Sequence, residues 1–213
     1  MTFLNLLGAT EPQNNSMLRV SLDLEPARFA GKLKGDGSRI YDFCTAILDS
    51  VANLVSAFKP KISYFAAHRR EGKFKSLMAS TRYLAPQVPI IQDAKRGNIG
   101  STAGQYAFER YDADAVTQSP FMGFDSVAPY LKYHGKDAFL LCHTSNPGGD
   151  DLQNQRLASV DGQPLQYAHI ARLAQDAWNL NGQLGLVVGA TYPTGIERVR
   201  AVAPTLPLLI PKA

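Results

Sequence analysis

The sequence predicts an α/β fold in which parallel strands alternate with helices, and three observations support this fold class. Short apolar or β-branched runs recur along the 213 residues. Several of these runs are apolar almost throughout, as expected for parallel strands that are covered on both faces. Longer segments between them carry apolar residues at three- and four-residue spacing, which is typical of amphipathic helices. Strands that alternate with helices in this way form right-handed βαβ units and hence a parallel sheet.

The predicted elements follow one another in strict alternation. The strands are expected at Leu18–Asp23, Leu54–Lys59, Val88–Lys95, Ala115–Ser119, Ala138–Thr144, Leu184–Ala190 and Leu206–Pro211. The helices are expected at Ile40–Ser56, Arg70–Leu84, Ser101–Arg110, Ser126–Tyr133, Leu165–Asn179 and Thr194–Val202. The first of these helices has the clearest pattern, since its apolar residues form a single stripe.

Composition limits the classes of protein to which the chain can belong. With 45% apolar residues, the chain is long enough for one domain with its own core. The net charge of +4 comes without a Lys/Arg block, so no nucleic acid is expected as a partner. No stretch is long and apolar enough to predict a membrane span, and residues 1–13 lack the features of a secretion signal. Cys44 and Cys142 each lie in an apolar run, which predicts buried free thiols and a cytoplasmic location.

Polar residues mark the carboxyl ends of the predicted strands. Asp23, Lys59, Asp93, Lys95 and Ser145 all lie at such an end or just beyond it. In a TIM (β/α)8-type barrel the carboxyl ends of the strands carry the chemistry, and a doubly wound open sheet also binds ligands there. The barrel is favoured because the first strand is followed by Asp-Leu-Glu-Pro rather than by a glycine-rich dinucleotide fingerprint.

The third predicted strand carries two candidate catalytic residues, Asp93 and Lys95. Residues two apart in a strand point the same way, so these two side chains are expected on one face. Nearby carboxylates favour the charged form of a lysine, and a positioned ammonium can protonate a carbanion that forms beside it. The alternative interpretation is that Asp93 and Lys95 form an ordinary surface ion pair without a catalytic role. Asp23 and Lys59 at neighbouring strand ends favour a functional site.

The motifs around these residues resemble those of the orotidine 5'-phosphate decarboxylase family. The third strand runs into Asp-Ala-Lys-Arg-Gly-Asn-Ile-Gly-Ser-Thr, which matches the family signature except at Asn98. Further matches follow in the family's order and cover essentially the whole chain: Leu22-Asp23, Phe58-Lys59-Pro60, Ser119 to Gly123, Thr144 to Gly149 and Val187 to Thr191. The Thr-Ser-Asn-Pro-Gly-Gly form is similar to a bacterial subgroup with longer loops.

The resemblance implies a decarboxylation of orotidine 5'-phosphate to UMP in pyrimidine biosynthesis, without a cofactor and in a homodimer. It assigns Lys95 as the donor of the proton that replaces carbon dioxide at C6 of the pyrimidine. Asp93 is expected beside the departing carboxylate, in a charged network with Lys59. Asp23 and Lys59 resemble ribose contacts, and Ser145 resembles a pyrimidine contact.

Two further substrate-binding residues and one departure lie in the same signature. Ile99 and Thr102 are expected in a segment that reaches the active site of the neighbouring subunit. Asn98 stands where the family has a second carboxylate. Asparagine keeps the size and can accept a hydrogen bond, but it brings no negative charge. We therefore expect Asn98 to belong to the catalytic network and to reduce turnover more than ligand binding.

The end of the sequence is the second departure from the family pattern. The last predicted strand is followed only by Lys-Ala, whereas phosphate-binding barrels hold phosphate with the loops after strands seven and eight. Pro211 matches the proline that opens the phosphate loop and is expected to be substrate-binding. The sequence thus predicts a single barrel domain, truncated after the seventh strand, in which the eighth βα unit is missing.

Two alternatives to a working decarboxylase remain. One is the related sugar-phosphate branch, hexulose-phosphate synthase and keto-gulonate-phosphate decarboxylase, which shares Asp-x-Lys-x-x-Asp but uses a metal. Lys59 and the Thr-Ser-Asn-Pro motif favour the nucleotide branch, and no histidines lie at metal-ligand spacing. The other alternative is an impaired remnant that only binds nucleotide or a partner subunit. Asn98 and the chain end favour this second alternative.

Overall fold

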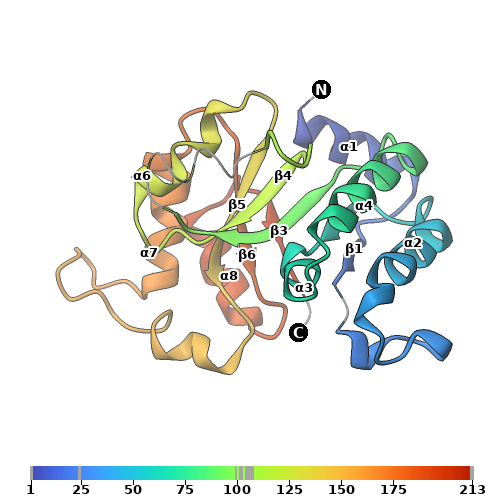
Figure 1. Cartoon of the computed structure of the whole chain (residues 1–213). Coiled ribbons are helices and arrows are strands. Elements are labelled where there is room, and N and C mark those ends of the chain that lie inside the picture. Colours follow the sequence, from blue (N-terminus) through green and yellow to red (C-terminus); the bar gives the residue numbers. More distant parts are fainter. Residues whose placement is uncertain (1, 24, 99, 101–102, 104–107, 212–213) are drawn as a thin grey trace. The chain divides into compact units, whose positions relative to one another are not determined.

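The computed structural model describes residues 2–23, 25–98, 100, 103 and 108–211 (Figure 1). The chain divides into two compact units. The first comprises Met1–Ala94, Phe108–Val116 and His134–Lys136. The second comprises Lys95–Ala107, Thr117–Tyr133 and Asp137–Ala213.

The described strands follow one another in sheet order as they do in the sequence. β1 pairs with β2 in parallel, from Arg19 opposite Ala57 to Leu22 opposite Pro60. Isolated parallel bridges join Phe58 to Ile90 and Lys61 to Asp93, and the other strands form one sheet in the order β3-β4-β5-β6-β7. The bounds are β1 Arg19–Leu22, β2 Ala57–Pro60, β3 Ile91–Arg96, β4 Ala115–Gln118, β5 Asp137–His143, β6 Leu184–Val188 and β7 Leu208–Leu209.

The helices of the first unit each bury one stripe of residues. They are α1 (Phe3–Gln13), α2 (Ile40–Val51), α3 (Ile62–Ala67) and α4 (Glu71–Leu84). Figure 1 shows α2 and α4 side by side, as their contacts also indicate. The buried residues of α2 are four apart along the helix, which places them on one face; they are Ile40, Cys44 and Leu48. Short 3-10 helices at Pro26–Arg28, Gly31–Leu33 and Gly37–Arg39 connect β1 to α2.

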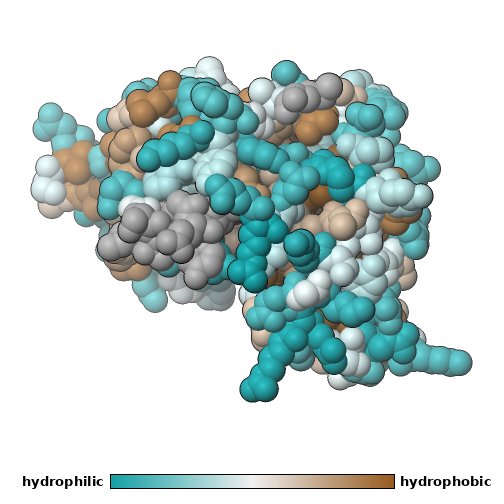
Figure 2. Space-filling view, turned by 45° about the horizontal axis from the view of Figure 1, so that its top comes forward, coloured by the Kyte–Doolittle hydropathy of each residue, from teal (hydrophilic) through white to brown (hydrophobic). Residues whose placement is uncertain are grey.

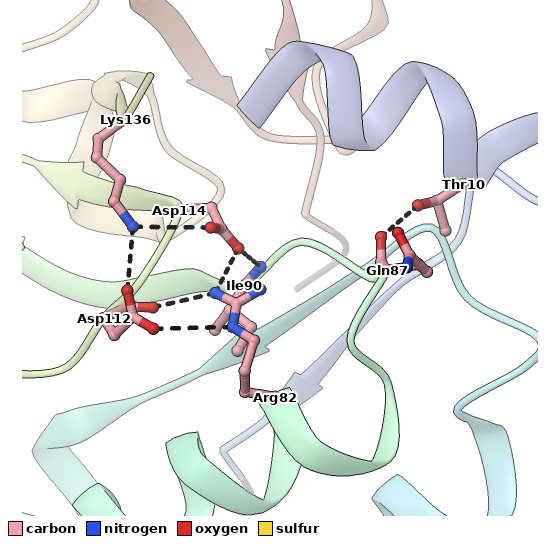
Figure 3. Close-up of polar contacts among 7 residues, drawn as sticks. All are labelled: Thr10, Arg82, Gln87, Ile90, Asp112, Asp114 and Lys136. Carbon is pink, nitrogen blue, oxygen red and sulfur yellow. Dashed lines mark hydrogen bonds and ion pairs between the residues drawn. The ribbon is translucent and has the colours of Figure 1, made fainter. Parts of the chain in front are cut away.

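Arg82 near the end of α4 and three charged residues that precede β4 or β5 form a network in the first unit, which we call the basal charge network (Figure 3). Its members are Arg82, Asp112, Asp114 and Lys136. The Arg82 guanidinium lies 2.8 Å from the Asp114 carboxylate and donates to the backbone carbonyl of Asp112 at 3.1 Å. Lys136 Nζ lies 3.3 Å from Asp112 and 3.7 Å from Asp114. Asp114 also accepts the backbone N–H of Ile90 at 2.9 Å, so the network ties the start of β4 to the start of β3.

In the second unit, helices α7 (Gln166–Leu173) and α8 (Pro193–Val202) pack against each other, and α7 also packs against β5. The other helical segments are α6 Phe124–Val127, Tyr130–Lys132, Pro147–Asp151 and Ala174–Trp178, the last of which is π-helical. The residues of β6 are all buried. Gly185 on β6 faces the ring of Phe139, and a Cβ at Gly185 would lie 2.5 Å from that ring. A larger residue at this position would therefore push β6 away from Phe139.

The predicted strands agree with the observed ones to within a few residues, whereas several helices need correction. The helix expected at Ile40–Ser56 ends at Val51, and Ser126–Tyr133 contains only part of α6 and one 3-10 turn. Helices α1 and α3 were not predicted. α1 buries only Phe3, Leu7 and Thr10 and contains Pro12, so its apolar stripe is weak in the sequence. The helix expected at Ser101–Arg110 lies mostly outside the described residues.

Hydrophilic residues cover much of the face shown in Figure 2, and apolar residues lie between them in smaller areas. The large apolar side chains that are fully buried include Phe3, Phe58, Phe65 and Phe74 in the first unit and Phe139 in the second. Full burial of one such side chain contributes about 1.5–3 kcal/mol. None of the helices in the described ranges is long and apolar enough to cross a membrane.

Candidate functional site

Three of the predicted site residues meet in the first unit, in what we call the strand-end cluster. Lys59 lies on β2, Asp93 on β3, and Asp23 follows the last residue of β1. Lys59 Nζ donates to Asp93 Oδ2 at 2.7 Å and lies 3.8 Å from Asp23 Oδ2. The parallel pairing of β1 with β2 and the Lys61–Asp93 bridge bring these positions together. These distances bring the three predicted residues together, and their common role in a functional site stays a prediction.

Burial makes the strand-end cluster electrostatically unusual. The side chain of Asp93 is 4% exposed and that of Lys59 is 11% exposed, whereas Asp23 is 25% exposed. Charges that are removed from water interact strongly with a ligand placed beside them, because the effective dielectric constant there is low. Within this cluster two carboxylates accompany one ammonium. Such fixed charge is suited to act on a charged group of a bound molecule.

Lys95 belongs to the second unit and has an unusual backbone. Its φ is +47°, in the left-handed region, although it lies within β3. A residue in this region ends the regular alternation of side chains along a strand, so the face expected to be common to Asp93 and Lys95 does not follow from strand geometry. The Lys95 N–H donates to Thr117 Oγ1 at 3.1 Å, and the Lys95 side chain is exposed.

Asn98 lies just beyond β3 and is partly exposed. It makes no hydrogen bond to any residue that the structure describes. Ile99 and Thr102, the two predicted contacts to a neighbouring subunit, lie outside the described residues. The carbonyl of Pro211 accepts the N–H of Ala190 at 3.0 Å, which places Pro211 beside the residue that follows Gly189.

Ser145 is placed by a tight set of backbone contacts after β5. Gly189 donates its N–H to the carbonyl of His143 at 2.7 Å. A Cβ on Gly189 would lie 2.9 Å from the Ser145 Cβ and 3.0 Å from its backbone nitrogen, so glycine is required for this close approach. The Gln153 side chain accepts the N–H of Thr144 and donates to its hydroxyl, each at 2.7 Å. These contacts fix the turn that presents Ser145.

His143 lies between two tyrosine rings directly before this turn. Its ring is 4.2 Å from that of Tyr167 and 4.4 Å from that of Tyr192, stacked at 6° and 28°. Burial lowers the pKa of His143, and the neighbouring Arg198 also lowers it, whereas Asp150 raises it. Neither ring nitrogen has a hydrogen-bond partner among the described residues. The imidazole therefore packs as an aromatic spacer between the two tyrosine rings, directly before the Ser145 turn.

Sequence reasoning did not identify Thr117, Gln153 or His143. Thr117 did not stand out because threonine is common in strands. Gln153 did not stand out because a glutamine in a loop does not by itself indicate a structural contact. A strand histidine gave no indication of its tyrosine neighbours, because those rings come from distant segments. Within the part of the chain that the structure describes, no group of three or more His, Cys, Asp or Glu could hold a metal ion.

Comparison with known proteins shows which family combines these features. The model of the orotidine 5'-phosphate decarboxylase / HUMPS family matches residues 16–213. The chain belongs to this family. It is 77% identical over 214 residues to the orotidine 5'-phosphate decarboxylase of Polaromonas naphthalenivorans, covering 99% of this chain and 76% of that protein. It is 71% identical to that of Albidiferax ferrireducens, covering 99% and 75%.

Solved structures of the orotidine 5'-phosphate decarboxylase family have the same fold. The OMP decarboxylase of Leishmania donovani superposes with a TM-score of 0.84 at 35% identity, covering 99% of this chain and 80% of that one. A putative orotidine-monophosphate-decarboxylase from Toxoplasma gondii gives a TM-score of 0.86 at 29% identity, covering 99% and 78%. The predicted family, its enzyme class and the TIM-barrel type of α/β fold are confirmed by these matches.

Proposed function

We propose that the chain decarboxylates orotidine 5'-phosphate to UMP and carbon dioxide without a cofactor, with Lys95 as the proton donor. The observation that carries the proposal is the strand-end cluster, in which the buried Asp93 is held by Lys59 at 2.7 Å. Those residues stand in the order and spacing of the family motifs, and relatives with 71% and 77% identity bear the name of this activity.

The chemistry requires one bond to break and one to form at the same carbon. The bond between C6 and the carboxylate carbon breaks, carbon dioxide leaves, and the electron pair stays on C6. The Lys95 ammonium then gives its proton to C6, which yields UMP. The exposed Lys95 regains a proton from water before the next turnover.

Asp93 contributes through its fixed negative charge. A buried carboxylate beside the substrate carboxylate repels it in the ground state, and the repulsion disappears when neutral carbon dioxide leaves. Lys59 orients Asp93, because its ammonium donates a hydrogen bond to the Asp93 carboxylate at 2.7 Å. Asp23 and Lys59 bind the ribose hydroxyls, and Ser145 contacts the pyrimidine.

We also propose an oligomeric state and a cellular location for the protein. We expect a homodimer in which Ile99 and Thr102 reach the partner's site, and a measurement of molar mass in solution by light scattering tests this. A cytoplasmic location is supported by the two free, buried cysteines, Cys44 and Cys142.

A decarboxylation assay that follows the loss of orotidine 5'-phosphate absorbance tests the proposed activity. The unaltered chain is expected to turn over, Lys95→Ala to lose turnover by at least about 10³-fold, and Lys75→Ala, which removes an exposed lysine on α4, to match the unaltered chain. Equal turnover in Lys95→Ala would contradict the role of Lys95. Calorimetric binding of UMP without any turnover by the unaltered chain would instead support the nucleotide-binding remnant that Asn98 suggests.

A further inference from the structure

The backbone of Lys95 is the one strained position within a described strand. Non-glycine residues with positive φ are Asn15, Arg69, Lys95, Asp112 and Gln163 among the residues that the structure describes, and all except Lys95 lie in turns or loops. The left-handed conformation is strained for a residue with a Cβ, because the Cβ approaches the backbone closely. Such a conformation persists only where surrounding contacts hold it. The contacts between Lys95 and β4 are therefore candidates for holding this conformation.

Two hydrogen bonds join this part of β3 to β4 and to the residue that follows β4. Thr117 Oγ1 accepts the N–H of Lys95 at 3.1 Å, and the N–H of Ser119 donates to the carbonyl of Arg96 at 2.5 Å. In a regular parallel ladder the first of these acceptors is a backbone carbonyl. Here the acceptor is the side-chain hydroxyl of Thr117, because the left-handed backbone at Lys95 turns its N–H away from the regular hydrogen-bonding direction of the sheet. The backbone stays close to β4 beyond this point, since a Cβ on Gly97 would lie 3.2 Å from the Ser119 Cβ.

Thr117 is well suited to this contact. It is 3% exposed, and its β-branched side chain has few allowed rotamers in a strand, so its hydroxyl is held in place. The hydrogen bond that it accepts from the Lys95 N–H is partly buried, so water competes with it only in part. Loss of the hydroxyl would therefore remove the interaction that offsets the left-handed backbone.

We propose that Thr117 is a positioning residue for the reaction: its hydroxyl holds Lys95 in the left-handed conformation that aims the ammonium at C6. The inference rests on the proposed role of Lys95 as proton donor. When the N–H loses this acceptor, the backbone relaxes toward the extended region and the Lys95 side chain changes direction. A displacement of about 1 Å at a reacting group lowers the rate by roughly 10²-fold.

Two substitutions with opposite expectations test the inference. Thr117→Val keeps the shape and removes the acceptor, whereas Thr117→Ser keeps the acceptor. In isotope-labelled protein, the HN–Hα coupling and the intraresidue NOE report the sign of φ at Lys95. We expect a positive φ in the unaltered chain and in Thr117→Ser, and its loss in Thr117→Val. We also expect kcat of Thr117→Val to fall by about 10–100-fold with KM changed less than about threefold, and Thr117→Ser to retain most of kcat.

A buried threonine elsewhere provides the matched control. Thr81 in α4 is fully buried and donates to the carbonyl of Leu77, so Thr81→Val also removes a buried hydroxyl but leaves Lys95 untouched. It is expected to keep both the φ of Lys95 and kcat. If Thr117→Val does not fold, Thr117→Ala removes the acceptor without crowding.

The two readouts separate failure of this inference from failure of the proposed function. A positive φ at Lys95 in folded Thr117→Val, or an unchanged kcat, overturns the positioning role. Absence of turnover in the unaltered chain overturns the proposed function, and the sign of φ then still decides whether Thr117 holds Lys95.

Discussion

The first unit contains two clusters of acidic and basic side chains with similar contacts and different positions on the strands. The strand-end cluster pairs Lys59 with Asp93 at 2.7 Å, and the basal charge network pairs Arg82 with Asp114 at 2.8 Å. The basal charge network precedes β3 and β4, binds a backbone N–H and balances two cations with two carboxylates. The strand-end cluster lies at the end of the barrel strands that carries chemistry and has excess carboxylate among its three members. We therefore propose that similar ion pairs serve stability at one end and reactivity at the other.

Asp93→Asn is expected to have the largest effect. It keeps the shape but removes the charge that repels the substrate carboxylate, so we expect turnover to fall by about 10²–10³-fold. Lys59 keeps Asp23 as a partner at 3.8 Å, so the free energy of unfolding is expected to fall by no more than the roughly 3 kcal/mol that removal of one partner of a buried ion pair costs. Steady-state kinetics and urea unfolding measure the two quantities. A large loss of stability with normal turnover would reverse the assignment of this cluster.

Asp114→Asn makes the same chemical change in the basal charge network. It breaks the short contact with Arg82 and weakens that with Lys136, and the Asp114 side chain is only 10% exposed. Removal of one partner of a buried ion pair costs about 3 kcal/mol, so the urea midpoint is expected to fall accordingly. A change below about 0.5 kcal/mol would show that the network contributes little to stability.

Asp137 is a third buried carboxylate of interest, and no charged side chain of the described residues forms an ion pair with it. It is 3% exposed, its Oδ2 has no hydrogen bond among the described residues, and burial raises its pKa to about 7. Because the folded pKa lies above the unfolded one, the stability of the fold decreases as pH rises from about 4 to 7.

Asp137→Asn is therefore expected to be more stable than the unaltered chain at pH 8, by about 1–3 kcal/mol, and equally stable near pH 4. Urea unfolding at several pH values measures this difference. A constant difference across that range would mean that Asp137 does not titrate in it.

Asn98→Asp is expected to have the smallest effect, and it tests how much charge the site needs. Restoring the carboxylate of the family signature is expected to raise turnover by about tenfold, because it adds fixed negative charge where the ammonium donor acts. Asn53→Asp, at an exposed position in the first unit, is the control for added charge in general. Equal turnover of Asn98→Asp and the unaltered chain would show that asparagine is tolerated there.

The sequence predicted the strands better than the helices, for a physical reason. Buried parallel strands are often apolar throughout, so β6 is evident from composition alone. Helix α1 contributes only a narrow buried stripe and was missed, and the end of α2 depends on packing that the sequence does not show. The residues of the candidate site also differ in how well the sequence predicts them. Asp23, Lys59 and Asp93 were predictable from strand ends, whereas the left-handed backbone of Lys95 and its bond to Thr117 arise from tertiary contacts.

The most direct test of the central claim records turnover and far-UV circular dichroism on the same samples of Asp114→Asn during a urea titration. The account predicts that the two curves coincide and that activity per folded molecule equals that of the unaltered chain. Loss of activity at urea concentrations where the variant is still folded would contradict it, because the basal charge network would then act on the chemistry and not on stability.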